Sequence, residues 1–342
     1  MRGRQFAPVE NQNANQREQT AEQQNNLARS QAYVADMLMA QQDFKGALEL
    51  YRRALQLRAA TAPQADLQPQ QEIARNHEAI SDAQWALGDS DGAWNSLQVA
   101  REILQQLATQ YPATPAIERG RAILAVKTSS LLAGKGQTKA ALEIAQQALP
   151  ILQPLAEADA VNAAYQRDLA FTHNQLGNLF WDAGNLRPAL QHYRAALNIH
   201  TALSSSDPQN QQALRDLALS LMNVGYTQVQ LGEVAQGLPN VRRSVEIYEA
   251  LAAGNPSQPN AQRDLQFCYN YFGDVYGFLA EKPSAINTRR SQWNEAKAWY
   301  QRSLRIYDTL NKQGLARPTD TAFAKQLSQA IAKCDAKLQS LK

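Results

Sequence analysis

The stretch LAFTHNQLGNLFWDAGNLRPALQHYRAAL, residues 169–197, decides the fold. Apolar residues at helical spacing run up to Gly184, and a second run with the same spacing begins at Leu186. Glycine suits the end of a helix because it adopts the left-handed backbone conformation of the turn without strain. Pro188 falls in the first turn of the second helix, where proline is tolerated. The stretch therefore predicts two antiparallel helices joined by a short turn.

The same pattern recurs every 48 residues along the chain, apart from a first step of 46 residues. The glycine that closes the first helix is found at Gly88, Gly136, Gly184 and Gly232. A small residue on the preceding helix is found at Ala35, Ser81, Ser129, Gly177, Gly225 and Gly273. Twelve residues later a second small residue follows, at Ala47, Ala93, Ala141, Ala189, Gly237 and Ala285. Repetition at this period indicates stacked helix pairs, each of which buries its apolar face only against its neighbours.

The expected fold is an all-α, right-handed superhelical solenoid of six antiparallel helix hairpins followed by a C-terminal capping helix. Residues 1–24 are rich in Gln and Asn, and we expect a polar tail, a linker or a helical lead-in there. The repeat array is expected over residues 25–315 and the capping helix over residues 316–342. In the sixth repeat the second small site moves to Ala296, which predicts an insertion near residues 281–292.

Three prolines fall inside expected second helices, at Pro150, Pro154 and Pro239. Proline removes a backbone donor and clashes with the preceding turn, so these helices are expected to be kinked or shortened.

The paired small and aromatic residues resemble the tetratricopeptide repeat. The residues that carry this resemblance are Gly177, Phe180, Gly184, Ala189, Tyr193 and Ala196. The usual tetratricopeptide unit is about 34 residues long, so the resemblance covers the helix-turn-helix centre of each repeat and not its extensions. It implies a non-catalytic scaffold whose first helices line a binding groove.

A narrower resemblance concerns the start of successive repeats. Residues 166–169 read Gln-Arg-Asp-Leu, 215–217 read Arg-Asp-Leu and 262–265 read Gln-Arg-Asp-Leu. With residues 299–304, Trp-Tyr-Gln-Arg-Ser-Leu, they look like long tetratricopeptide arrays in the C-terminal regions of bacterial serine/threonine kinases and related signalling proteins. The Arg and Asp side chains themselves are expected to cap the helix and pair with the neighbouring repeat rather than to bind a ligand.

The composition argues against several classes of function. The 342 residues include 34 Lys and Arg and 31 Asp and Glu, and no basic stripe suggests nucleic-acid binding. Two cysteines, Cys268 and Cys334, are too few for a disulfide framework or a zinc site, and Cys334 is expected to be buried. No apolar run reaches the roughly 18 residues of a membrane span. We expect a cytoplasmic chain, or an extracytoplasmic one if it is a fragment of a membrane-tethered protein.

No catalytic, cofactor or metal site is expected. The Gly-Lys-Gly-Gln-Thr sequence at residues 134–138 lacks the spacing of a phosphate-binding loop and occupies the place of an inter-helix turn. The four histidines, His77, His173, His192 and His200, form no metal-binding pair of the His-Glu-x-x-His type. No nucleophile, base and orienting group can be assembled from the motifs.

The binding residues are expected on the groove side of the first helices. Asn side chains can pair with the backbone of an extended peptide, and Trp or Tyr can anchor apolar side chains. The candidates are Arg75, Asp82, Trp85, Lys127, Asn174, Asn178, Trp181, Asn223, Tyr226, Asn270 and Asp274. The expected function is binding of a peptide or helix of a protein partner. The alternative is a regulatory or sensory module of a multidomain bacterial signalling protein such as a serine/threonine kinase.

Overall fold

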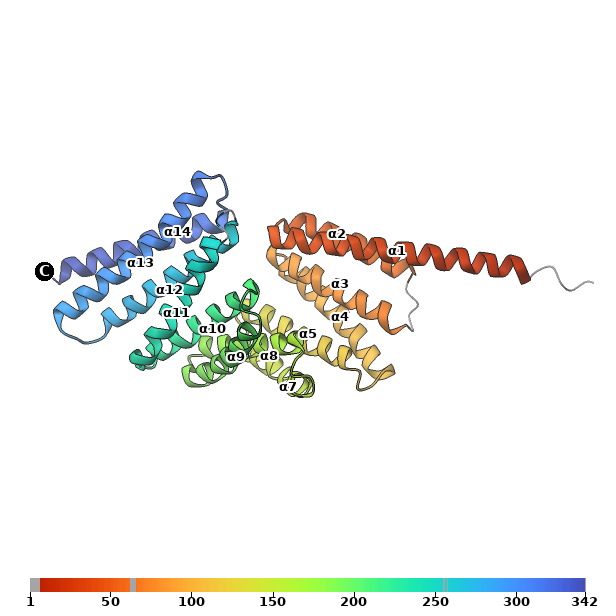
Figure 1. Ribbon diagram of the computed structural model, residues 1–342, viewed down its shortest axis with the longest axis horizontal. Coiled ribbons are helices and arrows are strands. Elements are labelled where there is room, and N and C mark those ends of the chain that lie inside the picture. Colours follow the sequence, from red (N-terminus) through yellow and green to blue (C-terminus); the bar gives the residue numbers. More distant parts are fainter. Residues whose placement is uncertain (1–6, 62–65, 255, 257, 342) are drawn as a thin grey trace, which may run out of the picture. The chain divides into compact units, whose positions relative to one another are not determined.

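The computed structural model describes residues 7–61, 66–254, 256 and 258–341, and these residues form helices and turns without a strand. Short turns join helices that pack in consecutive pairs (Figure 1). The helices are α1 Ala7–Gln41, α2 Phe44–Thr61, α3 Leu67–Ala86, α4 Ser90–Gln110, α5 Pro115–Gly134, α6 Thr138–Gln146, α7 Leu149–Ala158, α8 Ala163–Asp182, α9 Leu186–Ser206, α10 Gln211–Gln230, α11 Val234–Gly254, α12 Pro259–Glu281, α13 Ile286–Lys312 and α14 Pro318–Ser340. The prediction of an all-α array of helix hairpins is confirmed.

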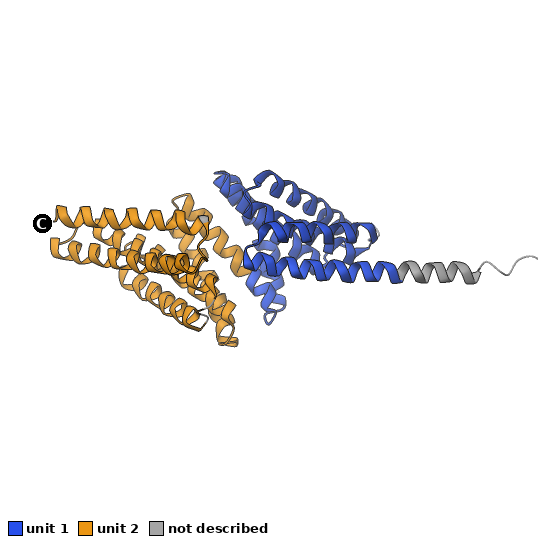
Figure 2. Ribbon diagram, turned by 90° about the horizontal axis from the view of Figure 1, so that it is seen from above, with its two compact units in different colours: residues 1–168 blue, residues 169–342 orange. Residues whose placement is uncertain are grey.

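The chain divides into two compact units, Met1–Asp168 and Leu169–Lys342 (Figure 2). Unit 1 holds the hairpins α1–α2 and α3–α4, and a third in which α5 pairs with α6 and α7. Unit 2 holds α9, the hairpins α10–α11 and α12–α13, and most of α8. The terminal helix α14 packs on α13. Cys334 is buried in that contact, as expected, together with Leu327 and Trp293.

Small residues sit where the two helices of a hairpin cross, as the repeat pattern predicts. A Cβ atom added at Gly225 would lie 2.7 Å from the carbonyl oxygen of Gly237, so the backbones of α10 and α11 touch there. At Gly177 and Gly273 the space is filled instead by the ring of Tyr193 or Tyr300 on the second helix. The small sites therefore let a backbone or an aromatic ring of the second helix approach the first helix closely.

The four glycines at the ends of first helices adopt the left-handed conformation, with φ between 75° at Gly136 and 87° at Gly232. The turn expected at residues 134–138 is therefore present, between the end of α5 and the start of α6.

The chain departs from a regular array at its N-terminal helix and in the sixth repeat. The N-terminal helix α1 begins at Ala7, so most of the polar segment 1–24 is a helical lead-in; residues 1–6 lie outside the described part of the chain. Most of residues 281–292 are helical, because α13 starts at Ile286 and is 27 residues long. The small site after this extension is Ala296, which is fully buried.

The prolines act differently from one another. Pro150 lies at the start of α7, and the second helix of the third repeat is split there into α6 and α7, as expected. Pro154 lies inside α7. Pro239 lies inside α11, which runs unbroken over 21 residues, so the shortening expected there is not observed.

Ion pairs join the start of a first helix to the start of the next first helix or, for Arg263, to the start of the capping helix α14. Arg119 pairs with Asp168, Arg215 Nε lies 2.7 Å from Asp264 Oδ2, and Arg263 Nε lies 2.9 Å from Asp320 Oδ2. The pairing of these residues with the neighbouring repeat is thus confirmed. Because repeats contact only their neighbours, such contacts set the register of the stack.

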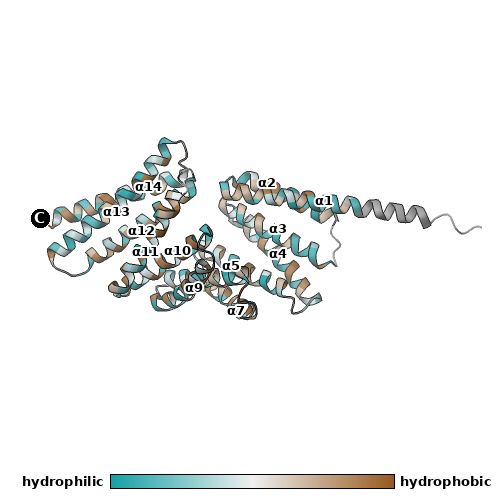
Figure 3. Cartoon of the chain, viewed as in Figure 1, coloured by the Kyte–Doolittle hydropathy of each residue, from teal (hydrophilic) through white to brown (hydrophobic). Residues whose placement is uncertain are grey.

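Every labelled helix carries both hydrophilic and apolar positions (Figure 3). Within the described ranges, no helix is sufficiently long and apolar to span a bilayer.

Candidate binding surface

Two charged candidates of unit 1, Asp82 and Lys127, neutralise each other. Lys127 on α5 reaches back to α3, where its Nζ lies 2.6 Å from Asp82 Oδ2 and 4.0 Å from Glu78 Oε2. Burial raises the pKa of Glu78 to about 7, while the nearby ammonium group of Lys127 acts in the opposite direction. Glu78, one turn before Asp82 on α3, is the third member of this cluster. The cluster joins two repeats and leaves little free charge for a ligand.

The other two candidates of unit 1 differ in their contacts. The indole ring of Trp85 packs against Gly134 of the next first helix, where an added Cβ would lie 2.3 Å from Trp85 Cη2. Even so, Trp85 remains 40% exposed. Arg75 is exposed on α3.

In unit 2 two of the candidates accept hydrogen bonds from the second helix of their own hairpin. The hydroxyl of Tyr193 donates to Asn178 Oδ1 over 2.7 Å, and the hydroxyl of Tyr300 donates to Asp274 Oδ1 over 2.8 Å. In unit 1 Tyr51 donates in the same way to Asp36. A buried hydroxyl needs a hydrogen-bond partner. This explains why an Asp or Asn directly follows the small residue of the first helix in the three hairpins whose second helix carries one of these tyrosines.

The remaining polar candidates of unit 2 are more buried than expected for a recognition surface. Asn270 Nδ2 donates to Asp274 Oδ2 over 3.1 Å, and burial raises the pKa of Asp274 despite its two hydrogen bonds. Asn174 is only 8% exposed, and no described residue hydrogen-bonds to its Oδ1 atom. Asn223 is half-buried.

Aromatic rings connect the first helices of unit 2 in a continuous row. Trp181 stacks on Tyr226 with ring centroids 5.2 Å apart, and Tyr226 meets Tyr271 edge-on at 5.4 Å. Phe267 lies 4.8 Å from Tyr271 and 6.5 Å from Phe323 of α14. The row thus passes from α8 through α10 and α12 to the capping helix. It brings together the predicted residues Trp181 and Tyr226.

Exposed apolar side chains accompany this row, and sequence reasoning did not single them out. Phe171, Leu219 and Phe267 are 56%, 37% and 44% exposed. They are spaced 48 residues apart and therefore occupy the same position on α8, α10 and α12. We call the side of these helices that carries the three residues, together with the aromatic row, the first-helix face of unit 2. A search for large apolar residues repeating outside the core phase would have found it.

Two of the histidines, His173 and His192, pair with each other, and His200 lies within hydrogen-bond distance of Ser220. His173 Nδ1 and His192 Nδ1 lie 3.0 Å apart, so one ring donates and the other accepts. Burial lowers the pKa of both rings, that of His173 to about 4. In the part of the chain that the structure describes, no group of three or more His, Cys, Asp or Glu residues could hold a metal ion.

Comparison with known proteins matches this geometry. Residues 27–63 match the family described as Tetratricopeptide repeat. The solved structure of BtubC from P. vanneervenii superposes with a TM-score of 0.57 at 18% identity, covering 79% of this chain and 92% of BtubC. The fold is tetratricopeptide-like.

Two further tetratricopeptide-like structures are similar over most of this chain. A Rap protein complexed with Competence and Sporulation Factor superposes with a TM-score of 0.53 at 13% identity, covering 91% of this chain and 76% of that protein. The signal transduction ATPase with a tetratricopeptide repeat sensor from Pyrococcus horikoshii gives a TM-score of 0.53 at 13% identity. That match covers 92% of this chain and 42% of the ATPase chain. A search of curated proteins found no match.

Proposed function

We propose that this chain is a non-catalytic protein-interaction scaffold that binds a peptide or helix of a partner on the first-helix face of unit 2. The observation that carries the proposal is the row of exposed apolar side chains at Phe171, Leu219 and Phe267 beside the continuous aromatic row. Large apolar residues repeated on one surface of a soluble protein are typical of an interaction site. Their equal spacing suits a helix or extended segment that lies across successive repeats.

The polar candidates contribute orientation rather than most of the affinity. The unpaired Oδ1 atom of buried Asn174 offers an acceptor to a backbone amide of the partner. The Nδ2 amino group of Asn178 can donate to the partner, because the Tyr193 hydroxyl contacts only the Oδ1 atom of this side chain. The similarity to a Rap protein solved with Competence and Sporulation Factor supports ligand binding by a fold of this kind.

The experiment measures whether the apolar row binds a peptide. Peptides are selected from a displayed random library with the intact chain, and the Kd of the best peptide is measured by fluorescence polarisation. The double variant Phe171→Ser/Phe267→Ser should weaken binding about tenfold or more, as expected for the central anchors of an interface. Both side chains are already exposed, so the variant should keep its helical circular dichroism spectrum.

The matched control is Ile286→Ser, which removes an equally exposed apolar side chain from the same unit at the start of α13. It should leave the Kd unchanged. Equal binding by the double variant, or equal loss with Ile286→Ser, would contradict the placement of the site.

The alternative is that the array is the sensory or regulatory module of a larger signalling protein. The similarity to an ATPase with a tetratricopeptide repeat sensor is the observation that favours it. Sequencing the reading frame on both sides of this chain tests it directly, since the alternative requires an attached or adjacent signalling enzyme.

A further inference from the structure

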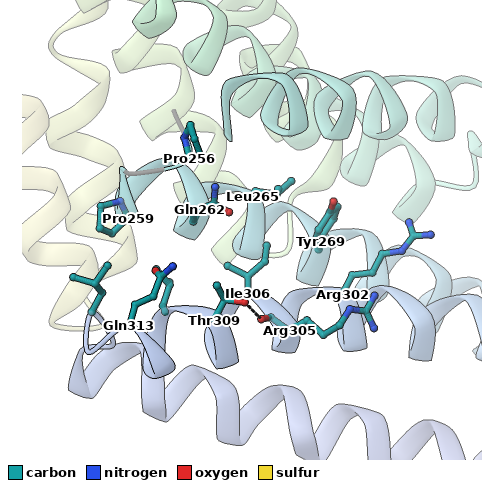
Figure 4. Close-up of a pocket in the computed structure, with 12 residues that line it drawn as sticks. Pro256, Pro259, Gln262, Leu265, Tyr269, Arg302, Arg305, Ile306, Thr309 and Gln313 are labelled. Atoms are coloured by element: carbon teal, nitrogen blue, oxygen red, sulfur yellow. Dashed lines mark hydrogen bonds between the residues drawn. The ribbon is translucent and has the colours of Figure 1, made fainter. Parts of the chain in front are cut away.

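A pocket of about 760 Å³ lies in the sixth repeat, between the start of α12 and the end of α13. Figure 4 shows Pro256 and Pro259 at one end of it and the side chains of Arg302 and Arg305 at the other. Its volume falls in the range of pockets that bind small organic molecules, roughly 300–1,000 Å³.

The pocket faces away from the proposed peptide surface. Gln262, Leu265 and Tyr269 line it from α12. By helical phase these residues lie on the side of α12 opposite to Phe267 and Tyr271. Ligand binding here is therefore independent of the proposed function.

The lining combines an apolar floor with two cations. Leu265, Ile306 and Leu310 provide apolar surface, and Leu315 contributes a side chain that is 43% exposed. No carboxylate of the described residues forms an ion pair with Arg302 or Arg305, although the guanidinium group of Arg302 packs over the Trp299 ring at 4.1 Å from its centroid.

A carboxylate lies near the cationic end. Glu249 Oε1 accepts a hydrogen bond from the Tyr269 hydroxyl over 2.7 Å. The guanidinium groups of Arg302 and Arg305 outnumber this carboxylate, so that end of the pocket stays positive beside an apolar floor.

The fifth repeat contains the equivalent pocket, which differs from that of the sixth repeat in its volume and in the charge of its lining. That pocket, of about 320 Å³, is lined by Pro208, Leu214, Ile247 and Leu251, the repeat-five counterparts of Pro256, Gln262, Ile306 and Leu310. The counterparts of the two arginines are Arg243 and Glu246, and Arg243 Nη1 lies 2.8 Å from Glu246 Oε2. Repeat five therefore neutralises its cation within the pocket, whereas repeat six has a second cation at that place and a larger volume.

The wall formed by the α13–α14 connection is held in place before any ligand arrives. Arg263 donates through Nη2 to the carbonyl oxygen of Leu315 over 2.6 Å, and through Nε to Asp320. The backbone amide of Leu315 donates to the carbonyl oxygen of Leu310 over 2.9 Å. A wall ordered in advance loses little conformational entropy when a ligand binds.

We propose that this pocket binds a small amphipathic carboxylate, with its apolar chain on the floor between α12 and α13 and its carboxylate at Arg302 and Arg305. Guanidinium groups match carboxylates geometrically, and charge-assisted hydrogen bonds are stronger than neutral ones. The apolar chain is required because exposed arginines alone bind an anion weakly in water.

Isothermal titration calorimetry of the full chain tests the proposal with laurate, dodecylamine and dodecanol, kept below their aggregation concentrations. Laurate should bind at one site, and the amine and the alcohol should bind at least about tenfold more weakly. Arg305→Glu restores the charge arrangement of repeat five and should weaken laurate binding about tenfold or more. Thr309→Phe, at an exposed lining position, should also weaken laurate binding, because it fills the pocket without changing its charge.

The control is Arg243→Glu, which makes the same charge reversal at an arginine that lines the pocket of repeat five and should leave the Kd for laurate unchanged. Circular dichroism checks that each variant is folded. No laurate binding, equal binding of dodecanol, or an unchanged Kd in Arg305→Glu would each overturn the proposal.

Discussion

The backbones of α10 and α11 touch at Gly225, and this contact predicts how the stability of unit 2 responds to a larger residue there. In Gly225→Ala the added methyl group would lie 2.7 Å from the carbonyl oxygen of Gly237 and 2.9 Å from the amide nitrogen of Val241. Both atoms belong to the backbone of α11, so no side-chain rotation can relieve the clash. The two helices of the hairpin must move apart instead.

Two opposing effects set the expected change in the free energy of unfolding. Overpacking of this kind costs about 1–3 kcal/mol. Replacing a glycine inside a helix by alanine stabilises the helix by about 1 kcal/mol. Because the obstructing atoms are backbone atoms, we expect the upper part of the cost, and a net loss of about 1–2 kcal/mol in the free energy of unfolding.

Urea unfolding followed by circular dichroism measures this loss. Gly254→Ala, at the end of α11 in the same hairpin, is the control, because no atom lies within 4 Å of its added methyl group. The control should be as stable as the original chain or slightly more stable. Hydrogen exchange should show the loss of protection in α10 and α11 first, since repeats contact only their neighbours. If Gly225→Ala were as stable as Gly254→Ala, the account of the crossing would be refuted.

Two further predictions concern the ion pairs and the histidine pair. Arg215→Ala removes the inter-repeat contact with Asp264 and should lower the free energy of unfolding by about 0.5–1 kcal/mol without changing peptide affinity; lost affinity at unchanged stability would assign Arg215 to the binding site. Burial lowers the pKa values of His173 and His192, so the unfolded chain binds protons at a higher pH than the folded chain does. The contribution of the pair to the free energy of unfolding is therefore complete above about pH 6.5 and is lost as the pH falls toward 4. Between pH 7 and pH 4.5, urea titrations should show that the free energy of unfolding falls by about 1–2 kcal/mol more in the original chain than in His173→Gln/His192→Gln, a figure that is discounted for partial solvent exposure. Equal losses in the two proteins would contradict this role of the histidine pair.

Most of the fold was predictable because each hairpin is specified locally. The glycine at the end of a first helix, such as Gly184, and the paired small residues, such as Gly225 and Gly237, act within one hairpin. Repetition then makes the stacking predictable, and even the pairing of Arg215 with Asp264 in the next repeat could be inferred from the register.

The candidate site was less predictable because a side chain's availability depends on what packs against it. Asn178 and Asp274 occupy positions that suggest ligand binding, yet each accepts a hydrogen bond from a tyrosine on the facing helix. Trp181 and Tyr226 were expected on the binding surface, and they do contribute to the aromatic row of unit 2. Phe171 and Phe267 repeat outside the core phase of their helices, so the sequence carries a signal for them, but only the structure shows that they are exposed.

The sequence by itself therefore determined the repeat unit, the helix ends and the all-α class, because these depend on residues close together in the chain. Only the tertiary structure decided which polar groups remain available and where pockets form. The pocket of the sixth repeat shows the reason. One wall of that pocket is the α13–α14 connection, which Arg263 holds from 52 residues earlier in the chain, and the repeat pattern does not extend to that connection.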